Sequence, residues 1–323
     1  MTQKPIRVAI EGAAGYTAGE LFRILINHPE AMICYATSSS NNGARVSDVH
    51  RDLLGDTDLT FGPMDTHRVD VIFVCKGHGK TAEFLSSTSI PQGVKIIDLS
   101  TDYRDESNGF VYGLPELQRD TIVRATRIAN PGCFATGIEL ALLPLAQANA
   151  ITDEVHINSI TGSTGAGQAP TDTTHFSWRN NNVSVYKPFK HQHLKEISMA
   201  MGKLQKGFAH PINLVPVRGN FSRGILSTLY TRCALSREEL QQLYASYYAS
   251  HPFVRLTSQN PDLKQVVNTN KCLLHIDKVD NKVFIVSAID NLLKGASGQA
   301  VQNMNIMFGI DEMAGLRLKG VGF

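Results

Sequence analysis

Short apolar runs alternate with helical patterns along the first third of the chain. The run Ile6–Ile10 leads into a helical pattern whose apolar residues share one face, at Leu21, Phe22, Leu25 and Ile26. A second run at Met32–Thr37 completes a strand, helix, strand unit. Two further buried runs, Val69–Cys75 and Val94–Leu99, flank a helix near Thr81–Ser86. This alternation predicts an α/β fold with a Rossmann-type parallel sheet.

The pattern changes after about residue 150, where the apolar runs lengthen, alternate in polarity and have few helices between them. These runs are Val155–Ile160, Asn213–Val217, Ile225–Cys233, Cys272–Ile276 and Val283–Ile289. They predict a second, α+β domain on a mostly antiparallel sheet. A helical pattern returns at Leu292–Phe308 and is expected to pack on the first domain. The predicted domains are therefore 1–130 with 292–323, and 131–291.

Composition agrees with two folded domains and excludes several partners. The 323 residues are 42% hydrophobic and 19% charged, enough apolar residues for two cores. A net charge of +2, spread along the chain, is too weak to bind nucleic acid. No apolar run approaches the length of a membrane span and no signal-peptide core is present, so a cytoplasmic location is expected. The five cysteines are odd in number and widely spaced, which favours neither disulfides nor a metal site.

A glycine-rich turn separates the first strand from the first helix. Only glycine allows so tight a turn, and the free N–H groups at the helix start can bind a pyrophosphate. This pattern predicts that the first domain binds a dinucleotide, although an ordinary strand–helix turn is the alternative. The residues expected at the cofactor are Gly12, Ala14, Gly15, Tyr16 and Thr17.

The loop after the second strand indicates which dinucleotide is used. NAD-selective sites usually carry an acid there for the ribose 2′-hydroxyl. This loop instead has Ser38 and Ser39, with Arg45 nearby and no acid before Asp48. Hydroxyl and guanidinium groups suit a 2′-phosphate, which favours NADP; the alternative is a polar surface loop unrelated to the cofactor.

Cys133 is the candidate nucleophile. It follows Asn130-Pro131-Gly132 and precedes the apolar segment Ile138–Leu145, which Pro144 is expected to kink or restart. At a helix start the macrodipole and the unpaired N–H groups favour the thiolate, which is the nucleophilic form. The other four cysteines lie in or beside predicted strands. A buried structural role is the alternative for Cys133.

A thiolate beside a dinucleotide suggests chemistry that couples an aldehyde to an acyl group through a thioester. Such chemistry needs an acid/base group, and the segment Tyr186–Glu196 offers His191, His193 and Glu196. No cysteine or further histidine stands at a metal-ligand spacing, so proton transfer is favoured over metal binding. A solvated histidine pair is the remaining alternative.

Together these motifs resemble those of the N-acetyl-γ-glutamyl-phosphate reductases of arginine biosynthesis, relatives of the aspartate-semialdehyde dehydrogenases. Eight motifs occur in the family's order, at 12–20, 98–104, 112–117, 130–133, 162–167, 191–196, 222–225 and 290–300. The resemblance implies that Cys133 attacks an acyl phosphate and that NADPH reduces the thioester. The product would be N-acetylglutamate semialdehyde.

The resemblance also assigns roles to the remaining candidate residues. His191 would be the acid/base, oriented by Glu196, with His193 as the second candidate. Arg104 would hold the phosphate and Arg223 a substrate carboxylate, because a guanidinium binds two oxygens at once; surface ion pairs are the alternative for both.

Gly165 and Asn291 would line the nicotinamide by the same resemblance. The chain departs from the family at Gln168 and Ser39, where arginine is frequent; Arg45 would then replace the second arginine. The stretch Gln168–Trp178 would suit acyl groups other than acetyl.

The resemblance further implies a homo-oligomer, a dimer or a tetramer, acting on a small molecule. An aspartate-semialdehyde dehydrogenase-like enzyme is the nearest alternative. A non-catalytic dinucleotide-binding sensor is an alternative of another class.

Overall fold

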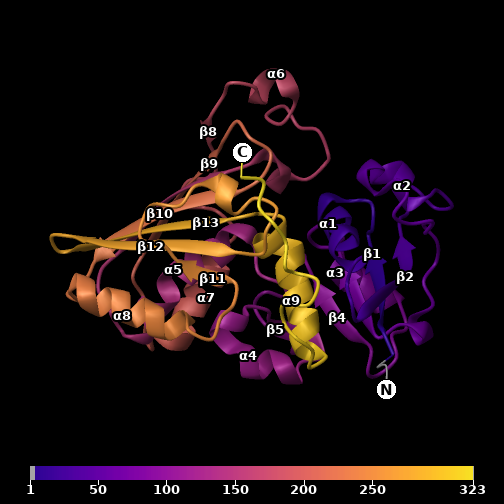
Figure 1. Ribbon diagram of the computed structural model, residues 1–323, viewed down its shortest axis with the longest axis horizontal. Helices are drawn as coiled ribbons and strands as arrows, with labels where there is room; N and C mark the ends of the chain where they lie inside the picture. The colour runs from indigo at the N-terminus through magenta and orange to yellow at the C-terminus, as the bar shows by residue number, and fades with distance from the viewer. Residues whose placement is uncertain (1–3, 323) are drawn as a thin grey trace. The chain divides into compact units, whose positions relative to one another are not determined.

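The computed structural model describes residues 4–322 and divides into two compact units (Figure 1). The first unit contains the described residues up to Pro131 together with Ala296–Arg317. The second contains Gly132–Gly295 and the described residues from Leu318 on. The boundaries expected from the sequence differ in three places. Pro131 belongs to the first unit, while 292–295 and 318–322 belong to the second.

The first unit is built on a parallel six-stranded sheet in the order β2-β1-β3-β4-β6-β5. Its strands are β1 (Ile6–Glu11), β2 (Ala31–Thr37), β3 (Val71–Val74), β4 (Lys95–Asp98), β5 (Val111–Tyr112) and β6 (Arg127–Ala129). Every pair is parallel, which confirms the predicted Rossmann-type sheet. The sequence pattern missed β5 and β6 because each is too short to show a period.

Helices complete the first unit. They are α1 (Tyr16–Leu25), α2 (Val46–Val49), α3 (Thr81–Ser87), α4 (Pro115–Arg124) and α9 (Gly298–Met307). All ten residues of α9 are buried, and this helix packs against α1, α4 and β4. Helix α9 is therefore part of the first unit, although it follows the second unit in the sequence.

The second unit is built on a seven-stranded sheet in the order β11-β12-β13-β10-β7-β9-β8. Its strands are β7 (Val155–Thr161), β8 (Ser184–Val185), β9 (Ile212–Arg218), β10 (Ile225–Arg232), β11 (Val254–Leu256), β12 (Cys272–Val279) and β13 (Lys282–Ile289). Four of the six pairs are antiparallel, in agreement with the predicted α+β domain.

The expectation of few helices in the second unit is wrong. The helices are α5 (Cys133–Gln147), α6 (Phe176–Arg179), α7 (Leu194–Leu204) and α8 (Arg237–Tyr248). The start of α8 is marked by a capping box, in which Ser236 and Glu239 each bond the other's backbone N–H.

Both units also contain 3₁₀ turns of three or four residues. They are η1 (Arg51–Leu53), η2 (Thr66–Arg68) and η3 (Ser107–Gly109) in the first unit, and η4 (Ser163–Ala166) and η5 (Leu263–Gln265) in the second.

Helix α5 runs through Pro144 as one helix, where a restart was possible. Proline has no N–H to donate to the carbonyl of Leu140, four residues earlier. The hydroxyl of Tyr248 on α8 donates to that carbonyl instead, and the Tyr244 hydroxyl donates to Ala141 O at 2.5 Å. Two buried hydroxyls on α8 therefore bond carbonyls next to the proline.

The predicted helix Leu292–Phe308 is two helices of different winding. A π-helical turn, η6 (Leu293–Ser297), precedes α9, and the compact units part within it, after Gly295. π-helical turns widen the helix by one residue and occur frequently at functional sites.

An excursion between β7 and β8 carries α6, drawn at the top of Figure 1. Phe176 and Trp178 on α6 are 79% and 46% exposed. Arg179 is buried beneath them and donates to the carbonyls of Thr173, Asn182 and Arg218. No helix among residues 4–322 is long and apolar enough to cross a membrane.

Candidate active site and dinucleotide site

The turn after β1 has the backbone geometry that its glycines predict. Gly12 has φ +77°, and a Cβ added to it would lie 3.0 Å from the carbonyl carbon of Cys75 at the end of β3. A Cβ on Gly15 would meet no atom within 4 Å, so the space above this residue is open. Gly15 is the N-cap of α1, and no side chain caps it. The N–H groups of the first turn, including those of Tyr16 and Thr17, therefore suit a pyrophosphate.

The serines expected at the ribose lie directly after β2. Ser38 accepts a hydrogen bond from Asn41 Nδ2 at 3.1 Å, and Ser39 is exposed. Arg45 is the N-cap of α2 and is exposed. The structure thus leaves Ser39 and Arg45 at the surface of the first unit, where both can reach a ligand.

Cys133 is the first residue of the 15-residue helix α5, and it is half-buried. Gly132 is the N-cap, and its N–H donates to the buried Glu196 carboxylate at 3.0 Å. No side chain caps the helix from the N-cap position. The thiol therefore lies where the helix dipole favours its anion.

Two other thiols are poor nucleophiles by comparison. Burial raises the pKa of Cys75 to about 12, and burial also raises the pKa of Cys34. Cys233 and Cys272 are buried. All five cysteines are free thiols.

The imidazole of His191 is kept neutral near pH 7. Burial, assisted by the charge of Lys187, lowers the pKa of His191 to about 4. Its Nδ1 accepts the backbone N–H of His193 at 3.3 Å, so the neutral ring carries its proton on Nε2. Phe134, next to Cys133 in α5, packs edge-on against this ring at 5.1 Å between centroids. His191 is thus placed as a hydrogen-bond donor through Nε2.

Glu196 lies close to His193, the second candidate for the acid/base group. The Nε2 of His193 lies 3.9 Å from Glu196 Oε1, one helical turn away. His193 packs against His191 with 4.6 Å between ring centroids. Among residues 4–322, no group of three or more histidine, cysteine, aspartate or glutamate side chains is arranged to hold a metal ion.

Arg104 is buried in the first unit and bonds the main chain. Its Nε donates to the carbonyl of Asn130 at 3.0 Å, and its Nη2 approaches the carbonyl of Leu99 at 3.5 Å. Asn130 in turn donates from Nδ2 to the carbonyl of Ala296 at 3.0 Å. Arg104 therefore fixes the segment that leads into Cys133.

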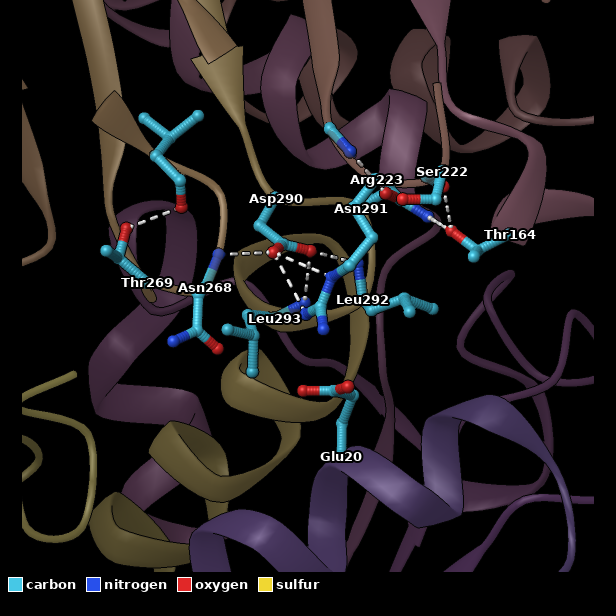
Figure 2. A network of polar contacts seen from close by, with 12 residues as sticks. Glu20, Thr164, Ser222, Arg223, Asn268, Thr269, Asp290, Asn291, Leu292 and Leu293 are labelled. Atoms are coloured by element: carbon cyan, nitrogen blue, oxygen red, sulfur yellow. Dashed lines mark hydrogen bonds and ion pairs between the residues drawn. The ribbon is translucent and has the colours of Figure 1, made fainter. Parts of the chain in front are cut away.

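Arg223 forms an ion pair that the sequence did not reveal. Its Nε and Nη2 lie 3.1 and 2.9 Å from the same carboxylate oxygen of Asp290, which is fully buried (Figure 2). The backbone N–H of Asn268 donates to that oxygen at 2.7 Å, and the N–H of Leu292 donates to the other oxygen at 2.8 Å. Asp290 thus holds Arg223 in one orientation.

Asn291 joins two loops with its amide group (Figure 2). Its Oδ1 accepts the N–H of Gly224 at 2.7 Å, and its Nδ2 donates to Thr164 Oγ1 at 3.0 Å. The Thr164 hydroxyl donates to the carbonyl of Ser222 at 2.6 Å. Gly165, the other residue expected at the nicotinamide, follows in η4, and a Cβ there would lie 3.9 Å from Asn291 Nδ2. Asn291 therefore fixes the Gly165 loop beside Arg223.

Two family models match the chain. One is described as the semialdehyde dehydrogenase NAD binding domain and matches residues 7–125; the other, the semialdehyde dehydrogenase dimerisation domain, matches 133–291. An N-acetyl-gamma-glutamyl-phosphate reductase of Parabacteroides distasonis is 55% identical over 98% of this chain and 100% of its own length. The chain belongs to this reductase family. A reductase of the same name from Bacteroides thetaiotaomicron is 54% identical with the same coverage.

Solved structures of aspartate semialdehyde dehydrogenases share the fold of the reductase family. The Vibrio cholerae enzyme II superposes with a TM-score of 0.73 at 16% identity and covers 95% of this chain and 99% of its own. An enzyme from Candida albicans, solved with NADP, gives 0.69 at 14% identity, over 94% of this chain and 99% of its own. The motif-based resemblance to the reductase family is confirmed.

Sequence reasoning missed three residues that shape the site of this family member. Asp290 lies within a quoted motif, but nothing local marks it as the partner of Arg223. Tyr186 packs edge-on against His191 at 5.8 Å, and burial raises its pKa above the ordinary range. Gly295 leaves so little space that an added Cβ would lie 2.8 Å from Cys133 Cβ. Its position in a predicted helix gave no signal of this close approach.

Proposed function

We propose that this chain reduces N-acetyl-γ-glutamyl phosphate to N-acetylglutamate semialdehyde, with NADPH as the reductant and Cys133 as the covalent nucleophile. The observation that carries the proposal is the 55% identity to a reductase of that name over 98% of this chain and 100% of that protein. The position of Cys133 at the start of α5 supports it, because thiolate chemistry is favoured there.

The first step is an attack by the Cys133 thiolate on the acyl carbon. The C–S bond forms, the C–O bond to phosphate breaks, and phosphate leaves with the electron pair. Glu196 holds the N–H of Gly132, which fixes the direction in which α5 starts. Arg104 supports the same turn from the first unit by holding the carbonyl of Asn130.

The second step needs a hydride at the thioester carbon, and a reduced nicotinamide would supply it when bound. The Nε2–H of His191 donates to the thioester oxygen as negative charge develops on it. The oxyanion then re-forms the carbonyl group and the C–S bond breaks, so the sulfur leaves with the electron pair as the thiolate and the aldehyde is released while His191 keeps its proton. His193, paired with Glu196, positions His191 through its backbone N–H.

Substrate selection rests on Arg223 in this proposal. Asp290 fixes the guanidinium, which then binds the substrate carboxylate, and Asn291 keeps the Gly165 loop beside it. For the dinucleotide, Ser38, Ser39 and Arg45 would contact a 2′-phosphate. The second unit would carry the self-association that the name of its family model describes.

The reverse reaction tests the substrate directly. Purified protein with NADP and phosphate receives N-acetylglutamate semialdehyde, its N-succinyl analogue or aspartate semialdehyde, and cofactor reduction is followed by absorbance. We expect reduction with an N-acylglutamate semialdehyde. Reduction with aspartate semialdehyde alone would overturn the proposal in favour of the nearest alternative.

A Cys133→Ser substitution tests the nucleophile. We expect the turnover number to fall at least about a thousandfold, since a serine hydroxyl without an activating base is a poor nucleophile. Cys34→Ser, in β2, is the matched control and should keep full activity. Full activity in Cys133→Ser would overturn Cys133 as the nucleophile. No activity in wild-type protein that binds NADPH would favour a non-catalytic sensor.

A further inference from the structure

The carboxylate of Glu11, a residue of β1, lies at the end of β2, a strand that contains no acidic residue. Glu11 is the last residue of β1 and pairs in register with Thr37, the last residue of β2. The Thr37 hydroxyl donates to Glu11 Oε2, and the N–H of Gly12 approaches that hydroxyl at 3.4 Å. The acid that NAD-selective sites carry at the end of the second strand is thus brought there from the first strand.

Lys76 neutralises this carboxylate. Its Nζ lies 2.8 Å from the second oxygen of Glu11, whose side chain is 12% exposed. Lys76 directly follows Cys75, whose carbonyl carbon lies against Gly12. The Lys76 ammonium also lies 5.6 Å from the centre of the Phe84 ring, which limits its freedom. The Glu11–Lys76 pair therefore lies at the carboxyl ends of β2, β1 and β3, beside the glycine turn.

The carboxyl ends of parallel strands are where such a sheet binds its dinucleotide. A carboxylate there accepts a hydrogen bond from a ribose 2′-hydroxyl and repels a 2′-phosphate. A paired ammonium cancels the repulsion and can itself bind the phosphate. The charge balance of the pair is thus suited to determine whether the phosphorylated dinucleotide is accepted.

We propose that the Glu11–Lys76 pair determines the cofactor preference of this chain, with Lys76 admitting the 2′-phosphate that Glu11 alone would exclude. This inference rests on the proposed use of a dinucleotide. It adds two residues to the site that the glycine turn and the β2 loop define.

The test is a double-substitution cycle read out by binding. Calorimetric titrations with NADPH and with NADH would be made on the wild type, Lys76→Met, Glu11→Gln and the double variant. We expect Lys76→Met to shift the ratio of the two dissociation constants roughly fivefold to tenfold towards NADH, and Glu11→Gln to shift it towards NADPH. The double variant should return close to the wild-type ratio. Lys80→Met, which breaks the exposed Lys80–Glu83 pair in the same unit, is the matched control and should leave the ratio unchanged.

The outcomes separate this inference from the proposed function. A constant ratio in both single variants, or equal changes in affinity for both cofactors, would overturn the role of the pair while dinucleotide use stands. Wild-type protein that binds neither cofactor would overturn the proposed function itself. The affinities of 2′,5′-ADP and 5′-AMP, each measured by competition with NADPH on the same four proteins, isolate the adenosine end of the cofactor. The ratio of the two affinities should show the same shifts.

Discussion

At the scale of single residues, Cys133 and His191 depend on their neighbours in different ways. The environment of the Cys133 thiol is determined by backbone groups, since this residue begins α5 and the preceding Gly132 N–H donates to Glu196. His191 owes its protonation state to burial, which keeps the ring neutral, and to the N–H of His193, which selects the tautomer. The pH dependence of turnover therefore tests the environment of His191 specifically.

We expect the acid limb of the pH–turnover profile to lie near pH 4, provided the fold persists there. The pKa of His191 is lowered to about 4, so its neutral, Nε2-protonated form persists down to that pH. A histidine with an ordinary pKa would lose activity below about pH 6.5. His191→Asn should lower turnover by about 10²-fold to 10⁴-fold. A limb near pH 6.5 that survives in His191→Asn would contradict this assignment.

Gly295→Ala tests the close approach of the π-helical turn to the nucleophile. The new Cβ would lie 2.8 Å from Cys133 Cβ, so the backbone of η6 or of α5 must shift. We expect turnover to fall by about a hundredfold, because small misplacements at a reacting group have effects of that size. Gly202→Ala in α7 is the control, since its Cβ would meet no atom within 4 Å and alanine favours a helix. Equal activity of the two variants would contradict the steric argument.

The sequence allowed prediction of features that one short segment determines. The Gly12 turn and the position of Cys133 at a helix start follow from adjacent residues. The pair of Arg223 with Asp290 joins positions 67 apart, and the Glu11–Lys76 pair joins the ends of two strands. Such pairs depend on strand order and register, which no local pattern contains.

At the scale of elements, α5 continues through a proline because another helix supplies the missing donor. Tyr248→Phe should lower the free energy of unfolding by about 1–3 kcal/mol, the cost of leaving the buried Leu140 carbonyl without a donor. Adding Pro144→Ala restores a backbone N–H to α5, so the same tyrosine substitution should cost less in that background. Chemical denaturation measures both values. Tyr230→Phe, at a 44% exposed position in β10, is the control and should have little effect.

The sequence predicted an element correctly where its apolar pattern extends over many residues. It failed where an element is short or mostly polar and is stabilised by contacts with distant residues. The longer strands of both sheets were located because their residues alternate or form buried runs, whereas the two-residue and three-residue strands β5, β6, β8 and β11 were missed. The helix α8 was missed because it is largely polar and only Leu240, Tyr244 and Tyr248 are buried in it. The change of winding at η6 was also missed, since a π-helical turn has no local sequence pattern of its own.

At the scale of the whole molecule, each unit contains a buried histidine whose pKa is lowered by burial: His28 in the first and His191 in the second. The ordinary pKa of histidine is 6.5. Below that pH the histidine is protonated in the unfolded chain and stays neutral in the folded one, so the free energy of unfolding falls as the pH is lowered. We expect the melting temperature to drop between pH 7 and pH 5. His28→Gln should reduce that drop, whereas the exposed control His67→Gln should not. An identical drop in both variants would contradict the role of His28.

The excursion that carries α6 has a practical consequence for spectroscopy. Trp178 is the chain's single tryptophan and is 46% exposed there, above the buried Arg179. Indole emission therefore reports on this peripheral segment and on neither sheet. A blue shift on adding an acylated substrate analogue would show that the indole becomes shielded from water in the presence of that molecule.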